Sequence, residues 1–203
     1  MKYLMKQNKF DAVTQGIFRI IYPAKCLFCN KVLDYKNAHT CYECQEKLTA
    51  PYPYNKNTKV PIHALKYQGV KTLARPIAHA MAKSINFNPD YLMPVPLHQN
   101  RLKARGFNQA ALLSMELAKI MNIPAIDGLV RVRDTAPQYG LSSKERAKNL
   151  ENAIALKEGF DPSGASILLV DDIYTTGATA RACECALKNA GAKRVEMVAF
   201  AKA

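Results

Sequence analysis

Two adjacent carboxylates and the hydroxyl-rich turn that follows them are the residues of this sequence best suited to chemistry. Asp171 and Asp172 come directly after a short apolar run at 167–170, and Thr175–Thr179 then leads into a helical pattern that reaches about Asn189. A short, unbroken apolar run after a turn signal is typical of a buried strand in a parallel sheet. We therefore expect the acidic pair where this strand ends, at the carboxyl edge of an open α/β sheet, which is where such folds bind ligands.

The turn after the acids suits a phosphate group. Amide N–H groups at the start of a helix have no partners within the helix and carry partial positive charge. Thr175, Thr176 and Thr179 can add hydroxyl donors, and Gly177 permits a positive φ and a close approach of the backbone. The carboxylates cannot bind phosphate, but they can accept hydrogen bonds from ribose hydroxyls or hold Mg²⁺ near them.

The ligand predicted by this combination is a phosphorylated sugar. The stretch has neither the G-K-[ST] of a P-loop nor the G-x-G-x-x-G of a dinucleotide-binding turn. The alternative is a purely structural strand, turn and helix. It leaves unexplained why two aspartates that repel each other stand side by side at a sheet edge.

The composition indicates a globular protein with an anionic partner. The chain has 203 residues, of which 49% are hydrophobic, enough for one ordinary domain and a small appendage. Its net charge of +13 favours phosphates or nucleic acid as partners, with a basic surface kept for solubility as the alternative. No apolar run approaches the ~20 residues that cross a bilayer, and no secretion signal is recognisable. We therefore expect a cytoplasmic location, without an integral membrane segment and with reduced thiols.

Two C-x-x-C knuckles near the N-terminus predict a structural Zn²⁺ site. The four predicted ligands are Cys26, Cys29, Cys41 and Cys44. Four thiolates can surround Zn²⁺ tetrahedrally and leave no open position for catalysis. Disulfides are the competing interpretation, and the lack of a secretion signal disfavours them. Cys183 and Cys185 lie two residues apart in a helical pattern, on different faces, so we expect them to pack separately.

The remaining pattern divides the chain into three regions. Residues 1–50 would hold an amphipathic helix and the zinc ribbon, and the proline- and asparagine-rich residues 51–61 a linker. Residues 62–203 would form the main domain. Its polar stretch at 131–149 is long enough to be a mobile active-site cover, with a solvated loop as the alternative. Helices are expected at about 72–85, 108–121 and 177–189, and strands at 90–97, 126–131, 167–170 and 194–200.

The whole pattern resembles the ComF/GntX family, the competence-associated phosphoribosyltransferase-like proteins. The shared motifs are the knuckles, A-L-K-Y-Q-G at 64–69, P-V-P-L-H at 94–98, Arg101, R-G-F-N-Q at 105–109, R-D-T at 133–135, Gln138, Glu145, Arg146, Asn149 and the stretch 167–179. That last stretch also resembles the 5-phosphoribosyl-1-pyrophosphate signature of type I phosphoribosyltransferases. The implied fold is α/β, a type I phosphoribosyltransferase-like parallel sheet with helices on both faces, plus a small N-terminal zinc-ribbon domain.

The signature departs from the wider superfamily at two positions. Tyr174 stands where an aliphatic residue is more common. Thr175 stands where purine-salvage relatives often carry an aspartate that acts as a base toward the nucleobase. The second departure argues against a 6-oxopurine acceptor.

The resemblance also implies roles for individual residues. Asp171 and Asp172 would hold the ribose hydroxyls, with Mg²⁺ bridging the ribose and the pyrophosphate. Lys66 and Tyr67 resemble the pyrophosphate loop, where a cation offsets the charge of the leaving group. The residues that would cradle the 5-phosphate are Thr175, Thr176, Gly177, Ala178 and Thr179. The arginines that would close over the leaving group are Arg101, Arg105, Arg133 and Arg146.

Two functions are compatible with these features. The family implies a cytosolic role in natural transformation, in which imported single-stranded DNA is handled with competence DNA-processing or helicase proteins. The protein would then be a phosphoribosyltransferase with an unknown acceptor. The alternative is a non-catalytic single-stranded nucleic-acid-binding protein that retains the sugar-phosphate site. The signature favours the first function, and the basic charge and predicted ribbon favour the second.

Overall fold

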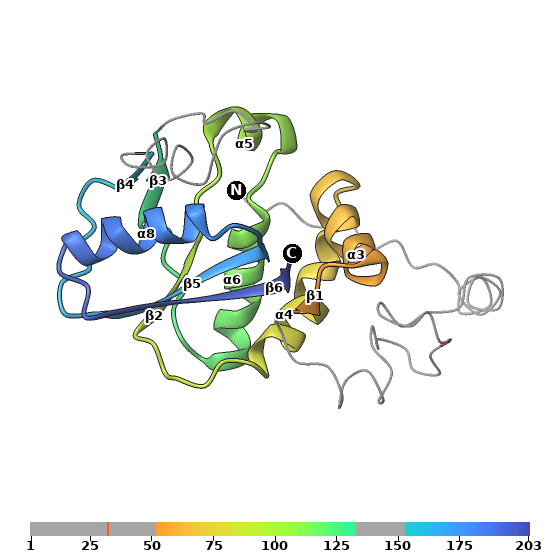
Figure 1. Cartoon of the computed structure of the whole chain (residues 1–203), viewed down its shortest axis with the longest axis horizontal. Coiled ribbons are helices and arrows are strands. Elements are labelled where there is room, and N and C mark those ends of the chain that lie inside the picture. The colour runs from red at the N-terminus through yellow and green to blue at the C-terminus, as the bar shows by residue number, and fades with distance from the viewer. Residues whose placement is uncertain (1–31, 33–51, 133–152) are drawn as a thin grey trace, which may run out of the picture. The chain divides into compact units, whose positions relative to one another are not determined.

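The computed structural model describes residue 32, residues 52–132 and residues 153–203 (Figure 1). The chain divides into two units, Met1–Glu46 and Lys47–Ala203. The helices and strands reported below belong to the second unit. The predicted N-terminal helix, the zinc knuckles and most of the predicted active-site cover lie outside the described residues.

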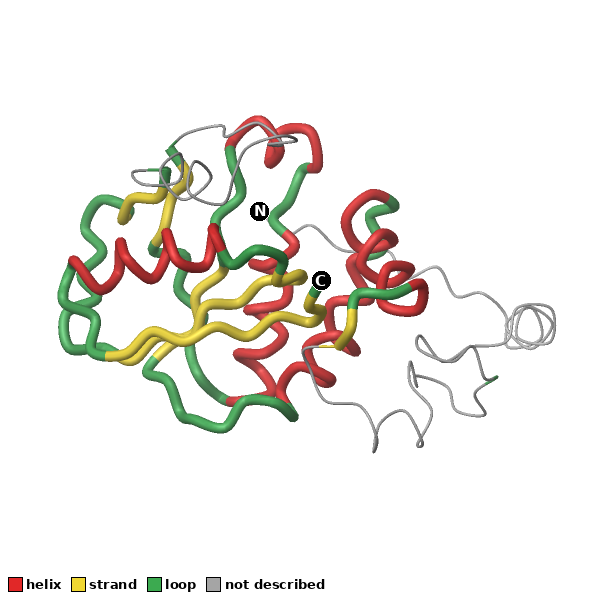
Figure 2. Tube along the Cα trace, in the orientation of Figure 1, coloured by secondary structure: helices red, strands yellow, loops and turns green. Residues whose placement is uncertain are grey.

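A four-stranded parallel sheet forms the centre of the second unit, with the strand order β1-β6-β5-β2 (Figure 2). Its strands are β1 (Tyr52–Pro53), β2 (Tyr91–Pro94), β5 (Ser166–Tyr174) and β6 (Arg194–Lys202). An isolated parallel bridge from Leu92 to Ala125 adds a further segment beside β2. Because β5 has a neighbour on each side and helices on each face, its first half is a continuous apolar run and does not alternate.

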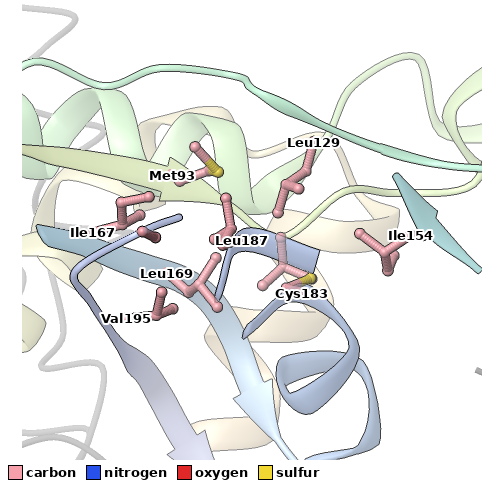
Figure 3. Close-up of a cluster of buried hydrophobic side chains, with 10 residues drawn as sticks. Met93, Leu129, Ile154, Ile167, Leu169, Cys183, Leu187 and Val195 are labelled. Carbon is pink, nitrogen blue, oxygen red and sulfur yellow. The ribbon is translucent and has the colours of Figure 1, made fainter. Parts of the chain in front are cut away.

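Helices cover both faces of this sheet. On one face, α4 (Ala74–Ala82) and α6 (Gln109–Met121) contact each other, and α6 contacts β2 and β5. On the other face lies α8 (Ala178–Asn189), which contacts β6 (Figure 1). Ile167 and Leu169 of β5 pack against Cys183 and Leu187 of α8 in a buried apolar cluster (Figure 3). Side chains alternate along a strand, so Leu168 points to the opposite face.

A separate antiparallel pair lies beside α8. It consists of β3 (Leu129–Arg131) and β4 (Ile154–Leu156). The strand predicted at 126–131 is therefore shorter than expected and lies outside the parallel sheet. Leu129 and Ile154 join the buried cluster against α8, and this burial explains why so short a pair is held in place.

Residues 52–61 belong to this folded unit, in contrast to the linker predicted over 51–61. β1 pairs with β6, and α3 (Lys56–Tyr67) begins within the same stretch. The Asn55 side chain accepts hydrogen bonds from the backbone of residues 57 and 58, and Thr58 Oγ1 accepts one from the Asn55 backbone. This capping box starts the helix. Pro61 lies inside α3, where it cannot donate a backbone hydrogen bond. Pro61 is buried, and the burial of its apolar ring offsets the loss of that bond.

The other predicted elements agree with the structure to within a few residues, with one exception. A 3₁₀ turn at Lys71–Leu73 precedes α4, and Gly191 follows α8 with a φ of 90°. The exception is α5 (Gln99–Arg105), a short helix in a basic stretch for which no helix or strand was predicted. His98 caps it by accepting a hydrogen bond from the backbone of Asn100 at 3.2 Å. Among the described residues, none of the helices is both long and apolar enough to cross a membrane.

Candidate functional site

The acidic pair lies inside β5 and not after its end. β5 stays paired with β6 through Asp171 opposite Ala199 and on to Tyr174 opposite Lys202. The sequence prediction ended this strand at Val170, where the apolar run stops. Because the backbone pairing continues, the two acids have a fixed register and their side chains point to opposite faces of the sheet.

Asp172 is buried, and its charge is balanced by a lysine from another element. Lys66 Nζ forms an ion pair with Asp172 Oδ2, and the two side chains are 16% and 4% exposed. Gln109 Nε2 donates a hydrogen bond to Asp172 Oδ1 at 3.2 Å. Lys66 is near the end of α3 and Gln109 is the first residue of α6, so three elements converge on this carboxylate. A buried carboxylate is costly unless it is paired, and this pairing explains how Asp172 can be buried.

Asp171 has a different environment. It is half-buried, and its Oδ1 accepts a hydrogen bond from the backbone N–H of Asp172 at 2.8 Å. Burial raises the pKa of Asp171 well above its ordinary value, and repulsion by Asp172 adds to the rise, while Lys66 acts in the opposite direction. A carboxylate whose charge the protein compensates this poorly is a suitable ligand for a divalent cation, which would reverse the shift. Its oxygen atoms are of the kind that Mg²⁺ prefers in proteins.

A buried thiol lies close to Asp171. Burial raises the pKa of Cys183 to about 12, and the charge of Asp171 contributes to that rise. Cys185 is exposed. The sequence prediction that these two cysteines lie on different faces of one helix is confirmed, and the Cys183 thiol stays protonated at neutral pH.

The predicted phosphate loop connects β5 to α8. Gly177 has a φ of 72° and occupies the N-cap position, so α8 begins at Ala178. Thr175 and Thr176 are exposed, and Thr176 Oγ1 accepts a hydrogen bond from the Ala178 backbone at 3.4 Å. The exposed hydroxyls and the positive end of a twelve-residue helix therefore lie at the same edge of the sheet as the acids.

The same glycine also makes room for Tyr174. A Cβ at position 177 would overlap the Tyr174 hydroxyl and lie 3.3 Å from Arg181 Nη1. Arg181 Nη2 donates a hydrogen bond to the Thr176 carbonyl at 3.0 Å. Arg181 is a residue of this loop that was not predicted from the sequence, although its place in the first turns of the helix after the signature is a usable signal. The loop therefore has a tyrosine and an arginine against it.

The residues predicted as a pyrophosphate loop are the last two residues of a helix. Lys66 and Tyr67 end α3, and the turn that follows contains Gly69 with a φ of 66°. The Arg105 guanidinium lies over the Tyr67 ring, 5.3 Å from its centre. Arg101 is exposed on α5.

The structure thus brings part of the predicted ligand-binding set into contact. The residues joined by these contacts are Lys66, Tyr67, Arg105 and Asp172, with Gln109 between the last two, while the Asp171 side chain lies on the other face of β5. Arg133, Arg146 and the four predicted zinc ligands lie outside the described residues. Within the described ranges, no group of three or more histidine, cysteine, aspartate or glutamate side chains is placed to hold a metal ion.

Comparison with known proteins defines first the class and then the family. Residues 105–203 match the phosphoribosyl transferase domain family, in agreement with the parallel sheet covered by helices on both faces. The chain is therefore a protein of the type I phosphoribosyltransferase-like α/β class. Among solved structures, the allosteric regulatory enzyme of purine biosynthesis is 20% identical, with a TM-score of 0.42 over 63% of this chain and 25% of that one.

Two bacterial proteins are similar over most of their length. The chain is 32% identical over 196 residues to Competence protein F of Haemophilus influenzae, covering 88% of this chain and 84% of that protein. It is 31% identical over 173 residues to the DNA utilization protein YhgH of Escherichia coli strain K12, covering 76% and 75%. The chain belongs to the ComF family, as the sequence motifs predicted.

Proposed function

We propose that this protein binds 5-phosphoribosyl-1-pyrophosphate with Mg²⁺ at the carboxyl end of β5. The observation that carries the proposal is the grouping of Asp171, Asp172 and Lys66 beside the N-terminus of α8. One end of this site can accept hydrogen bonds from ribose hydroxyls, and the other can bind a 5-phosphate. The site therefore has a complementary group for each part of the donor.

The proposed pathway is natural transformation, in which the protein handles imported single-stranded DNA in the cytosol. The relatives support this part of the proposal, because one is a competence protein and another a DNA utilization protein. The proposed activity is transfer of the phosphoribosyl group to an acceptor that is still unknown. In that reaction the bond from ribose C1 to pyrophosphate breaks, and a bond from C1 to the acceptor forms.

The residues of the site would have distinct roles in this transfer. Ribose hydroxyls that donate to Asp172 would compete with Lys66, whose ammonium group could then turn to the pyrophosphate and offset its charge. Asp171 would hold Mg²⁺, which would supply positive charge to the bound donor. Thr175, Thr176 and the N-terminal amides of α8 would bind the 5-phosphate.

Calorimetric titration of the full-length protein with this donor and Mg²⁺ tests the proposal. We expect saturable binding that falls at least about tenfold in Asp171→Asn and in Asp172→Asn, because each loses a charged hydrogen-bond or metal partner. The matched control is Glu184→Gln, which removes an exposed acid from α8. The proposal is wrong if the wild-type protein does not bind the donor, or if the two aspartate variants bind it as Glu184→Gln does.

A second candidate function is supported by the net charge of +13. A non-catalytic protein could use the same site to hold a sugar phosphate while its basic surface binds single-stranded nucleic acid. Pyrophosphate release in the presence of donor, Mg²⁺ and a panel of bases and strands separates the two functions. Donor binding without release, together with strand binding that weakens steeply with salt, would favour the second.

We also propose that Cys26, Cys29, Cys41 and Cys44 hold one structural Zn²⁺. Elemental analysis of protein purified without chelator should give about one zinc per chain, and the quadruple serine variant should give none. Zinc-free wild-type protein in which all four thiols react readily with an alkylating reagent would contradict this assignment.

A further inference from the structure

Gln109 joins the acidic strand to a cation on a different element. Its Nε2 donates to Asp172 Oδ1 at 3.2 Å, and its Oε1 accepts a hydrogen bond from Arg105 Nη1. Arg105 ends α5 and Gln109 begins α6, with a turn between them in which Gly106 has a φ of 79°. Gln109 is only 6% exposed, so these contacts lie largely out of water.

The two partners permit only one orientation of the Gln109 amide. An arginine can only donate hydrogen bonds, and an ionised aspartate can only accept them. The amide oxygen must therefore face Arg105, and the amide nitrogen must face Asp172. A flipped amide would put donor against donor and acceptor against acceptor, and would leave both buried groups without a partner. The contact is thus directional, and a glutamate could not reproduce it.

The start of α6 does not depend on the Gln109 side chain. Asn108 is the N-cap residue, and its side chain accepts a hydrogen bond from the Ala110 backbone at 3.0 Å. The Asn108 amide also donates to the Val95 carbonyl at 3.0 Å, which ties the helix start to the end of β2. Because capping and anchoring are already provided, the polar groups of Gln109 need another explanation.

We propose that Gln109 is a positioning residue that fixes Arg105 relative to Asp172. The inference rests on the proposed function, in which Asp172 receives the ribose, and it adds that the Arg105 cation, held beside Asp172 through Gln109, binds the pyrophosphate. Arg105 is also held from a second side, because its guanidinium lies over the Tyr67 ring. Asp172, which would bind the ribose, and Arg105, which would bind the pyrophosphate, are therefore held in one geometry before the donor binds. This reduces the side-chain entropy that is lost when both parts of the donor bind together.

Three probes distinguish positioning from ordinary packing. Gln109→Met keeps the length of the side chain and removes both hydrogen bonds. With Mg²⁺ present, the variant should bind 5-phosphoribosyl-1-pyrophosphate about tenfold more weakly than the wild-type protein, the loss expected for one charged hydrogen bond. Ribose 5-phosphate and inorganic pyrophosphate each engage only one half of the site, so their affinities should change less than about threefold. The readout is the dissociation constant of each probe from calorimetry.

Two further variants control this experiment. Ser114→Ala alters another buried polar residue of α6 and should leave all three affinities unchanged. Gln109→Glu still accepts from Arg105 but cannot donate to Asp172, so it should also weaken the complete donor more than either half, and it serves if the methionine variant does not fold. Arg105→Met should abolish most of the further effect of Gln109→Met, because partners in one contact are not additive.

Each outcome bears on a different proposal. Equal weakening of all three probes, or none, overturns the positioning role and leaves the proposed function standing. A wild-type protein that binds neither the complete donor nor its halves overturns the proposed function and this inference together. Selective weakening of the complete donor supports both.

Discussion

Asp171 and Asp172 are neighbours in the chain, but they belong to two different regions of the molecule. Asp172 lies on the side of β5 covered by α6, where Lys66 and Gln109 both contact its carboxylate. Asp171 lies on the other side, where its charge acts on the buried Cys183 of α8 and its own pKa is raised by burial. The comparison shows how one strand can carry two acids at a single edge. One is neutralised by the protein itself, and the other is left for a ligand to neutralise.

The largest expected effect comes from removing the cation that neutralises Asp172. Lys66→Met leaves Asp172 buried without its cation, and removal of one partner from a buried ion pair typically costs ~3 kcal/mol or more. We expect the free energy of unfolding in urea to fall by about that amount. Asp172→Asn in the same background should recover a large part of the loss, because the uncompensated charge is then gone.

A lysine on the same helix provides the control for that prediction. Lys59 is exposed on α3, and Lys59→Met should change stability by less than about 0.5 kcal/mol. If Lys66→Met and Lys59→Met lower the free energy of unfolding by the same small amount, the ion pair contributes nothing to stability. Asp172 would then not differ from Asp171 in being neutralised by the protein.

A smaller effect of opposite sign is expected for Asp171→Asn. Because the pKa of Asp171 is raised in the folded protein, the folded state holds this proton more tightly than the unfolded state does. The free energy of unfolding therefore falls as the pH rises from about 4 to the raised pKa of Asp171, and it stays reduced at higher pH. In metal-free buffer at pH 8, the melting temperature of the variant should be a few degrees higher than that of the wild-type protein. At pH values below the pKa of a free aspartate, the two melting temperatures should be equal.

Thermal unfolding across this pH range measures the difference. Glu184→Gln removes an exposed carboxylate from α8 and should show no such trend. A destabilised Asp171→Asn variant at pH 8 would mean that Asp171, like Asp172, is already neutralised by the protein. That result would remove the reason for assigning the cation to this side of β5.

The apolar and small-residue signals of the sequence were sufficient to predict the central strand of the sheet and the helix that follows the candidate site. The run Ile167–Val170 predicted a buried parallel strand, and the structure confirms it. Gly177 and the threonines predicted the start of α8 to within one residue. These signals are local, because burial and helix capping depend on residues that are close in the sequence.

The parts that could not be predicted depend on distant partners. β5 continues past its apolar run because β6 is there to pair with it, and nothing in residues 171–174 indicates this. The ion pair joins Lys66 to a residue more than a hundred positions later. The first half of α3 was assigned to a linker because residues 51–61 are rich in proline and asparagine, although the capping box of Asn55 and Thr58 was already visible in the sequence.

β5 keeps one register against β6 from Ser166 to Tyr174, and this register decides which face of the sheet each side chain occupies. Loss of one residue from the apolar run, followed by renewed pairing with β6, would exchange the surroundings of the two acids, because a shift of one residue turns every side chain to the opposite face. Changes of length in the turn that precedes Ser166 would leave their assignment intact. Evolution can therefore lengthen or shorten the chain around this strand, but within it only substitutions preserve the site.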